Sequence, residues 1–346
     1  MDGNGNRVLI IYHNQDLDGV VSASVARLYY SFFNDVAIRL VGYNYGEPIA
    51  KIEDAVKIHN PDTIIVTDIS FGSDTESVFR SWQMNDLDVV WIDHHKTAIE
   101  SSERWEWPVE GLRRVGDAAT ALAWKWFGNK AKEEDEGWWK TWWRNTPLII
   151  QAVSDYDVWN TGSNIGWDNI LDIQYGLRSK IGLDPERAYT AMCSRIKSNL
   201  DDIAVKGKAI RDYERQKFET QAKANAFRGL CCGYKAMFVN TLDFGSLIFE
   251  TFDSDPDIQV LVCFSVNVGK GRVRFGIYPH PSGGGDVDCG KIAKLFSGGG
   301  HVGAAGFEVS IFNAVWMGFT HTNDIEAPKK ESDKKEVPRD NRTLAC

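Results

Sequence analysis

Short apolar runs alternate with longer amphipathic stretches through the first hundred residues of the chain. The runs have the length and the β-branched content of strands buried on both faces, and the stretches between them have the length and spacing of helices. This alternation predicts a doubly wound, mainly parallel α/β sheet in which crossover helices join the strands. The expected strands are residues 8–12, 36–43, 63–67 and 89–92, and the expected helices are residues 19–33, 48–59 and 74–85.

The rest of the chain predicts a second domain. At 346 residues, the chain exceeds the size at which a single core stops growing. Charged helix formers predominate in residues 185–226, and strand-like runs return after them. The expected organisation is an α/β domain at 1–183, a helical linker at 184–226, a smaller α/β domain at 227–317 and a disordered charged tail at 318–346.

Two further helices are expected at residues 117–127 and 138–153, with the charged residues 130–136 as an exposed loop between them. Six tryptophans in this region have helical spacing and lie away from the strand ends, which favours core packing or a subunit contact and leaves a homodimer open. They are Trp124, Trp126, Trp138, Trp139, Trp142 and Trp143. Trp159 is the better candidate for stacking on a base.

Metal-capable side chains follow three of the expected strands. Asp93-His94-His95 closes the strand at 89–92, the first strand runs into His13-Asn14-Gln15-Asp16-Leu17-Asp18-Gly19, and the third runs into Asp68. Ligands of open α/β sheets gather outside the carboxyl ends of the strands, so these side chains are expected to converge. Taken singly, Asp18 or Asp68 would more often be a turn residue or a helix N-cap, and His13 a structural histidine. Their joint placement at three strand ends argues for one site.

The donor set indicates two divalent cations. An Asp-x-Asp turn can aim one carboxylate at each of two ions, Asp68 could bridge them, and His94 could cap one. Mixed imidazole and carboxylate ligands suit Mn²⁺ best, with Mg²⁺ or Co²⁺ as alternatives and Fe²⁺ or Zn²⁺ harder to exclude. Two such ions about 3.5–4 Å apart activate water and hold a phosphoryl group during in-line displacement.

Composition limits the partners. The net charge of −9 argues against an extended basic footprint for long duplex nucleic acid, although bound cations would reverse the sign locally. The six cysteines have no CxxC pair, which favours reduced thiols. The start of the chain is short and polar, and no run of about 18 apolar residues follows. A cytoplasmic protein without a membrane segment is therefore expected.

Taken together, the motifs resemble the DHH phosphoesterases that carry a C-terminal DHHA1 domain. Besides Asp-His-His and Asp-x-Asp-Gly, the chain has Gly298-Gly299-Gly300-His301 followed by Ala304-Ala305-Gly306-Phe307, which is similar to the substrate loop of that family. The resemblance covers most of residues 7–316. Within the family, residues 13–20, 92–98 and 156–159 look similar to the nanoRNase B type of oligoribonuclease.

The resemblance implies a role for each matching position. One cation is expected on His13, Asp16 and Asp68. The other is expected on Asp18, Asp68, His94 and a later aspartate. Asp157 is favoured for that last ligand and Asp155 is the alternative, because by helix or strand geometry only one of the two can point inward.

For the residues around the ions, the resemblance implies that His95 faces the substrate as general acid or phosphate donor and that Asp93 fixes an imidazole tautomer. Lys96 would add a cation, and Gly298, Gly299, Gly300 and His301 would bind a terminal nucleotide. The spacing of His13 and Asp16 differs by one residue from some versions of the family. Ser297 stands where a further glycine is often found.

The function implied is a metal-dependent phosphodiesterase that hydrolyses short single-stranded RNA or DNA to nucleoside monophosphates, with its site in the cleft between the domains. Cyclic or linear dinucleotides and 3′-phosphoadenosine-5′-phosphate are alternative substrates for the same chemistry. A catalytically silent nucleotide-binding module is the alternative from another class, but such proteins usually lose ligands, and this chain has a residue at each candidate metal position.

Overall fold

The computed structural model describes residues 6–193, 197–242, 245, 248–249, 252 and 255–316. The chain divides into two compact units, Met1–Arg211 and Asp212–Cys346. This division falls inside the long helix α10 (Lys197–Asn225). The predicted domain boundaries stay predictions, and the predicted tail at 318–346 lies outside the described residues.

The first unit is built on a parallel sheet with strand order β2-β1-β3-β4. Its strands are β1 (Arg7–His13), β2 (Ala37–Tyr43), β3 (Thr63–Thr67) and β4 (Asp88–Ile92). From β2 at one edge the chain returns past β1 to form β3, so the winding reverses between β1 and β3. The carboxyl ends of strands at such a reversal border the crevice in which open α/β sheets bind ligands.

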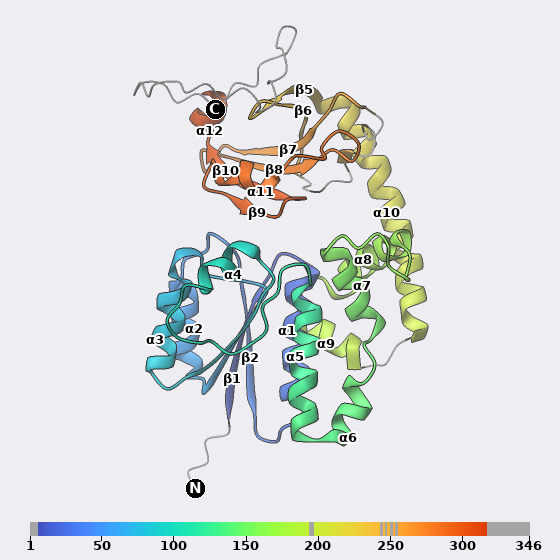
Figure 1. Ribbon diagram of the computed structural model, residues 1–346. Helices are drawn as coiled ribbons and strands as arrows, with labels where there is room; N and C mark the ends of the chain where they lie inside the picture. Colours follow the sequence, from blue (N-terminus) through green and yellow to red (C-terminus); the bar gives the residue numbers. More distant parts are fainter. Residues whose placement is uncertain are drawn as a thin grey trace. The chain divides into compact units, whose positions relative to one another are not determined.

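Helices cover both faces of this sheet, as Figure 1 shows for α2 (Ala50–His59) and α3 (Thr75–Met84) on one face and α1 (Leu17–Tyr30) and α5 (Ala119–Glu134) on the other. Successive side chains of a strand point to opposite faces. Leu9 therefore packs with α2 and α3, whereas Ile10 packs with α1 and α5. The α/β class predicted from the alternation is confirmed, and each expected strand and helix of the first hundred residues is present within a few residues of its predicted ends.

A helical region completes the first unit, and it differs from the prediction. After α5 come α6 (Glu136–Trp138), a π-helix (Trp139–Trp143), α7 (Leu148–Asp157), α8 (Trp167–Ile181) and α9 (Pro185–Cys193). The loop predicted at 130–136 is wrong, because Lys and Glu are good helix formers and α5 continues on them to Glu134 while burying Ala131. The helix predicted at 138–153 is interrupted, since Pro147 precedes α7 as its N-cap.

The side chains of Trp138 and Trp142 lie outside the described residues, and two of the other four tryptophans lie in the core of this unit. Trp124 and Trp143 are buried, with ring centroids 4.5 Å apart. Trp126 and Trp139 are partly buried against the same core. Core packing, one of the two alternatives favoured by their spacing, is what the structure shows for this pair.

The second unit contains a six-stranded sheet with order β5-β6-β7-β8-β10-β9. Its strands are β5 (Ala226–Cys231), β6 (Tyr234–Asn240), β7 (Val260–Asn267), β8 (Arg272–Pro279), β9 (Gly299–Gly300) and β10 (Ala305–Ser310). The pair β6–β7 is parallel and the other pairs are antiparallel. Helices α11 (Cys289–Lys294) and α12 (Ile311–Trp316) belong to this unit. In the part of the chain that is described, no helix is both long and apolar enough to cross a membrane.

A crossing of α8 with the first part of α10 depends on glycine. A Cβ atom at Gly207 would lie 1.7 Å from the carbonyl oxygen of Asp172, whereas one at Gly128 in α5 would come no closer than 3.5 Å to its neighbours. We expect Gly207→Ala to lower the free energy of unfolding by about 1–3 kcal/mol or more, because the helices must separate. Gly128→Ala, the matched control, should be neutral or stabilising by up to about 1 kcal/mol, since alanine favours a helix. Urea unfolding followed by circular dichroism measures both, and equal midpoints would contradict the expectation.

Candidate active site

The turn after β1 brings His13 and Asp16 together. Asp16 is the N-cap of α1, where its Oδ1 accepts a hydrogen bond from the amide of Gly19 at 3.0 Å. Its other oxygen, Oδ2, lies 3.0 Å from Nδ1 of His13. Gly19 makes this turn possible, because a Cβ atom there would lie 2.1 Å from the carbonyl oxygen of His13. The local sequence therefore presents an imidazole and a carboxylate side by side at the end of β1.

Asp18, on the first turn of α1, is held by the start of another helix. Its side chain is buried, and its two carboxylate oxygens accept hydrogen bonds from the amides of Ala119 and Thr120, each at 2.8 Å. The hydroxyl of Thr120 also donates to the backbone oxygen of Asp18 at 3.0 Å. These amides begin α5, and the positive end of a helix stabilises a negative charge. The contacts fix the orientation of the Asp18 carboxylate.

Asp68 follows β3 and lies between two imidazoles. Its Oδ2 is 3.5 Å from Nδ1 of His13, and its Oδ1 is 3.2 Å from Nε2 of His94. The residue has a φ of 58°, a left-handed conformation that is uncommon outside glycine, and its amide donates to the oxygen of Ile92 at 2.9 Å. Backbone strain of this kind concentrates at functional sites. The two oxygens of Asp68 thus link the end of β1 with the end of β4.

Asp93 organises the two histidines that follow β4. It is fully buried, and its Oδ1 accepts hydrogen bonds from the amides of His94 at 2.7 Å and His95 at 3.1 Å. The same oxygen lies 2.7 Å from Nδ1 of His95. A carboxylate at that distance keeps the hydrogen on Nδ1 and leaves Nε2 for another partner. This geometry fits the predicted role of Asp93 in fixing an imidazole tautomer.

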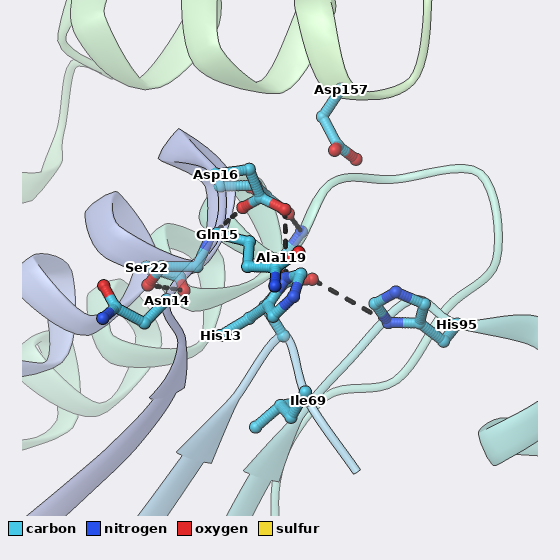
Figure 2. A network of polar contacts seen from close by, with 12 residues as sticks. His13, Asn14, Gln15, Asp16, Ser22, Ile69, His95, Ala119 and Asp157 are labelled. Carbon is cyan, nitrogen blue, oxygen red and sulfur yellow. Dashed lines mark hydrogen bonds and ion pairs between the residues drawn. The ribbon is translucent and has the colours of Figure 1, made fainter. Parts of the chain in front are cut away.

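Asp157 reaches the same place from the last residue of α7. Its Oδ2 lies 3.5 Å from Nε2 of His94, which is also 3.8 Å from Oδ2 of Asp18. Figure 2 shows the turn after β1, His95 and Asp157 approaching one region from different elements. The alternative residue, Asp155, is engaged elsewhere, since its carboxylate oxygens accept hydrogen bonds from the side chains of Asn160 and Ser163 at 2.9 and 2.5 Å. The geometry favours Asp157 as the ligand of these two.

The predicted ligand atoms include two groups in which every atom lies within 4.8 Å of the others: His13, Asp16 and Asp68, and Asp18, His94 and Asp157. Three buried atoms of these groups lack a hydrogen bond among the described residues: Nδ1 of His13, Oδ1 of Asp68 and Oδ2 of Asp157. Buried polar atoms ordinarily have a hydrogen-bond partner. Buried nitrogen and oxygen atoms without one, on side chains that commonly bind metals, fit a site for cations. Imidazole nitrogens and carboxylate oxygens are also the right donors for Mn²⁺ or a related ion.

The pKa shifts of two of these aspartates also indicate bound cations. Burial and the charge of Asp68 raise the pKa of Asp18 from 3.8 to about 7. Burial also raises the pKa of Asp157, and Asp18 adds to that shift. Carboxylates that raise one another's pKa in this way need positive charge nearby to be ionised together, and a divalent cation supplies it.

Comparison with known proteins places the chain in a family. No family model matches it. It is 32% identical to the oligoribonuclease NrnB of Bacillus subtilis over 309 residues, which are 87% of this chain and 72% of that protein. The chain belongs to the DHH phosphoesterase family, and to its nanoRNase type. It is therefore a hydrolase of the phosphodiesterase and nuclease kind, as the resemblance of its motifs predicted.

Solved structures agree on the fold. A crystal structure of an exopolyphosphatase-related protein from Bacteroides fragilis is 15% identical, with 90% of each chain covered and a TM-score of 0.52. The exonuclease RecJ, crystallised with manganese, is 13% identical, with 90% of this chain and 88% of that chain covered and a TM-score of 0.50. These likenesses support the two-domain α/β fold of the DHH family.

The residues predicted to bind substrate lie outside the two ligand groups. Lys96 begins α4 (Lys96–Ser102), where its exposed amine is 3.6 Å from a carboxylate oxygen of Glu100. Gly298, Gly299, Gly300 and His301 belong to the second unit. There, Gly299 and Gly300 pair with β10 as strand β9, and His301 is exposed. Their binding roles stay predictions.

Sequence reasoning missed Tyr45. It follows β2, and its ring centroid lies 5.7 Å from that of His13 and 5.9 Å from that of His95. Tyr45 is 51% exposed and meets both imidazoles in edge-type contacts, so it lies at the border of the site. Its position just beyond the carboxyl end of a strand is the sequence signal for it, but an aromatic side chain there does not stand out as a metal ligand would.

Proposed function

We propose that this protein is a divalent-metal-dependent phosphodiesterase that hydrolyses short single-stranded oligonucleotides to nucleoside monophosphates. The observation that carries the proposal is the pair of ligand groups joined through Asp68 at the reversal of the sheet. The similarity to an oligoribonuclease over most of both chains supports the substrate class. A short substrate also suits an acidic protein, because it needs few contacts to phosphates.

In this proposal His13, Asp16 and Asp68 hold one cation, and Asp18, Asp68, His94 and Asp157 hold the other. Such a pair of ions, when bound, lowers the pKa of water and neutralises charge that develops on a phosphoryl group. Mn²⁺ is proposed because the donors mix imidazole and carboxylate.

The protein's own contribution is orientation. The amides of Ala119 and Thr120 direct the carboxylate of Asp18. Asp93 holds Nδ1 of His95, and although burial lowers the pKa of this imidazole, the charge of Asp93 outweighs burial and raises it above 6.5. The protonated ring can donate through Nε2 to a phosphate oxygen or to the leaving group.

Product analysis tests the proposal. The purified protein, with Mn²⁺ or with a chelator, is incubated with an end-labelled RNA 5-mer, a linear dinucleotide, a cyclic dinucleotide and 3′-phosphoadenosine-5′-phosphate. Chelator-sensitive conversion of the 5-mer to mononucleotides is the expected result. If only one of the other compounds is turned over, that compound replaces the oligonucleotide as the proposed substrate. Release of inorganic phosphate would identify the enzyme as a phosphatase. Turnover of none would contradict the enzyme and favour a silent nucleotide-binding module.

Mn²⁺ is expected to raise the melting temperature, and to raise it more at pH 8.5 than at pH 6. Ligation requires an ionised Asp18 and neutral histidines. Burial lowers the pKa of His13 and His94, but the carboxylates that lie against these rings outweigh burial and raise each pKa from 6.5 to about 10. In the metal-free protein, groups with a raised pKa stabilise the folded state at low pH. That contribution to the free energy of unfolding is lost as pH rises through about 7 for Asp18 and about 10 for the two histidines.

A metal concentration of 100 times Kd should add about 2.7 kcal/mol to the free energy of unfolding. Thermal melts with and without Mn²⁺ at the two pH values measure the effect. The Asp68→Asn variant is the control and should show little of it. A shift that is equal at both pH values would contradict competition between protons and metal.

A further inference from the structure

Three aromatic side chains form an exposed group beside Asp157. Tyr156 precedes that aspartate on α7, Trp159 follows it, and Trp167 begins α8. The ring centroids of Trp159 and Trp167 are 4.8 Å apart, and the ring of Tyr156 is stacked on that of Trp167 at 6.1 Å with an interplanar angle of 10°. Trp159 is nevertheless 56% exposed and Tyr156 is 37% exposed. We call these three residues the aromatic cluster.

The backbone holds Trp159 in an unfavourable conformation. Its φ is 57°, in the left-handed region where a bulky side chain is rarely found. The loop is tied down by Asp155, whose carboxylate accepts hydrogen bonds from the side chains of Asn160 and Ser163. The backbone oxygen of Asp155 also accepts from the amide of Asn160 at 2.8 Å. A strained residue that the surrounding contacts maintain, and that leaves a large apolar ring in water, suggests a function for that ring.

Arg178 connects this surface with the metal ligands. It lies on α8, and its Nη2 donates a hydrogen bond to the backbone oxygen of Gln15 at 3.2 Å, next to Asp16. The charge of Arg178 also acts on the phenol of Tyr156, as do the charges of Asp157 and Asp16, so the cation lies near both the aromatic cluster and two of the candidate metal ligands. Arg178 is an exposed residue, so its side chain is accessible to an anion.

Exposed aromatic rings beside a cation and a phosphodiester-cleaving centre match the chemistry of a nucleotide. Bases of any sequence stack on aromatic side chains, and the arginine guanidinium forms bidentate hydrogen bonds with phosphate oxygens. We propose that the aromatic cluster and Arg178 bind the nucleoside next to the scissile phosphate, with the base stacked on Trp159 and an adjacent phosphate oxygen paired with Arg178. This subsite rests on the proposed function, because it assigns one end of the oligonucleotide to a surface of the first unit.

The test compares an RNA dinucleotide with its counterpart in which both bases are missing. With the Mn²⁺-loaded enzyme, Trp159→Ala should raise KM for the dinucleotide by about 5- to 150-fold, the range that the loss of one stacked base gives. The ratio of kcat/KM for the dinucleotide to that for the abasic compound should fall by the same factor. Trp159→Phe should recover most of the loss, since phenylalanine also stacks. Arg178→Ala should raise KM for both compounds, because its proposed partner is a phosphate.

Tyr213→Ala is the control, as Tyr213 is an exposed aromatic residue on α10 outside the cluster. An unchanged KM in Trp159→Ala, or an equal loss with both compounds, would overturn the subsite. Binding of adenosine 5′-monophosphate, measured by calorimetry, separates the two proposals. If the wild-type protein cleaves no oligonucleotide but loses nucleotide affinity on Trp159→Ala, the subsite stands and the proposed reaction fails. Equal affinity of wild type and variant would overturn the subsite whatever the activity.

Discussion

Asp68→Asn is expected to lower the turnover of a short oligonucleotide by at least about 10³-fold. Asp68 places one oxygen 3.5 Å from His13 and the other 3.2 Å from His94, so it is the one side chain in the proposed set of ligands that would serve both cations. An amide keeps the shape but carries no charge and offers only one oxygen as a ligand. Both ions would therefore bind more weakly.

Asparagine is the right replacement because it tolerates the left-handed backbone that Asp68 adopts, with its φ of 58°, better than alanine does. A folded but inactive variant is then the expected outcome, checked by circular dichroism beside the kinetic assay. Asp54→Asn is the matched control, since that aspartate lies exposed on α2 and should keep wild-type activity. Activity of Asp68→Asn within about tenfold of wild type would contradict the bridging role.

The paired variants Asp157→Asn and Asp155→Asn should separate the two candidates for the last metal ligand. Asp157→Asn is expected to reduce kcat/KM by about 10²-fold or more and to weaken the stabilisation by Mn²⁺, because its Oδ2 lies 3.5 Å from His94 in the second ligand group. Asp155→Asn should leave the response to Mn²⁺ intact. Asp155→Asn should instead lower the stability of the loop, because the charge-assisted hydrogen bonds with Asn160 and Ser163 are lost.

Titration of Mn²⁺ against melting temperature, together with initial rates, distinguishes the pair. The reverse result, in which Asp155→Asn loses the metal response and Asp157→Asn keeps it, would assign the ligand to Asp155. The loop contacts of Asp155 also position Trp159, so a rise in KM without a loss of metal response in Asp155→Asn would fit the proposed aromatic subsite.

The parallel sheet and the ligands at its strand ends follow from local sequence. Each strand of the first unit is a short apolar run, and the polar residues that end the runs must lie at the carboxyl edge of a parallel sheet. His13, Asp68 and His94 are therefore brought together by topology alone. The short distances between these side chains follow from the alternation of strands and helices in the sequence.

The helical region was less predictable because its signals conflict. Charges at 130–136 indicated a loop, yet the residues as far as Glu134 continue α5, and only Ala131 among them is buried. Helix α8 was not expected, since glycine, asparagine and serine before it obscure its start. Its crossing with α10 at Gly207 is a contact between residues far apart in the sequence, which local periodicity does not record.

By itself, then, the sequence determined the class of fold, the family and the candidate ligands that come directly after strands, because strand ends carry their side chains to one edge whatever else the chain does. Only the tertiary structure decided how Asp18 is held by the start of α5, why Asp157 rather than Asp155 turns toward His94, and how Trp159 comes to lie exposed beside Trp167. Those outcomes depend on how helices pack against one another. Packing is set by the shapes of residues distant in the sequence, not by the spacing of neighbours.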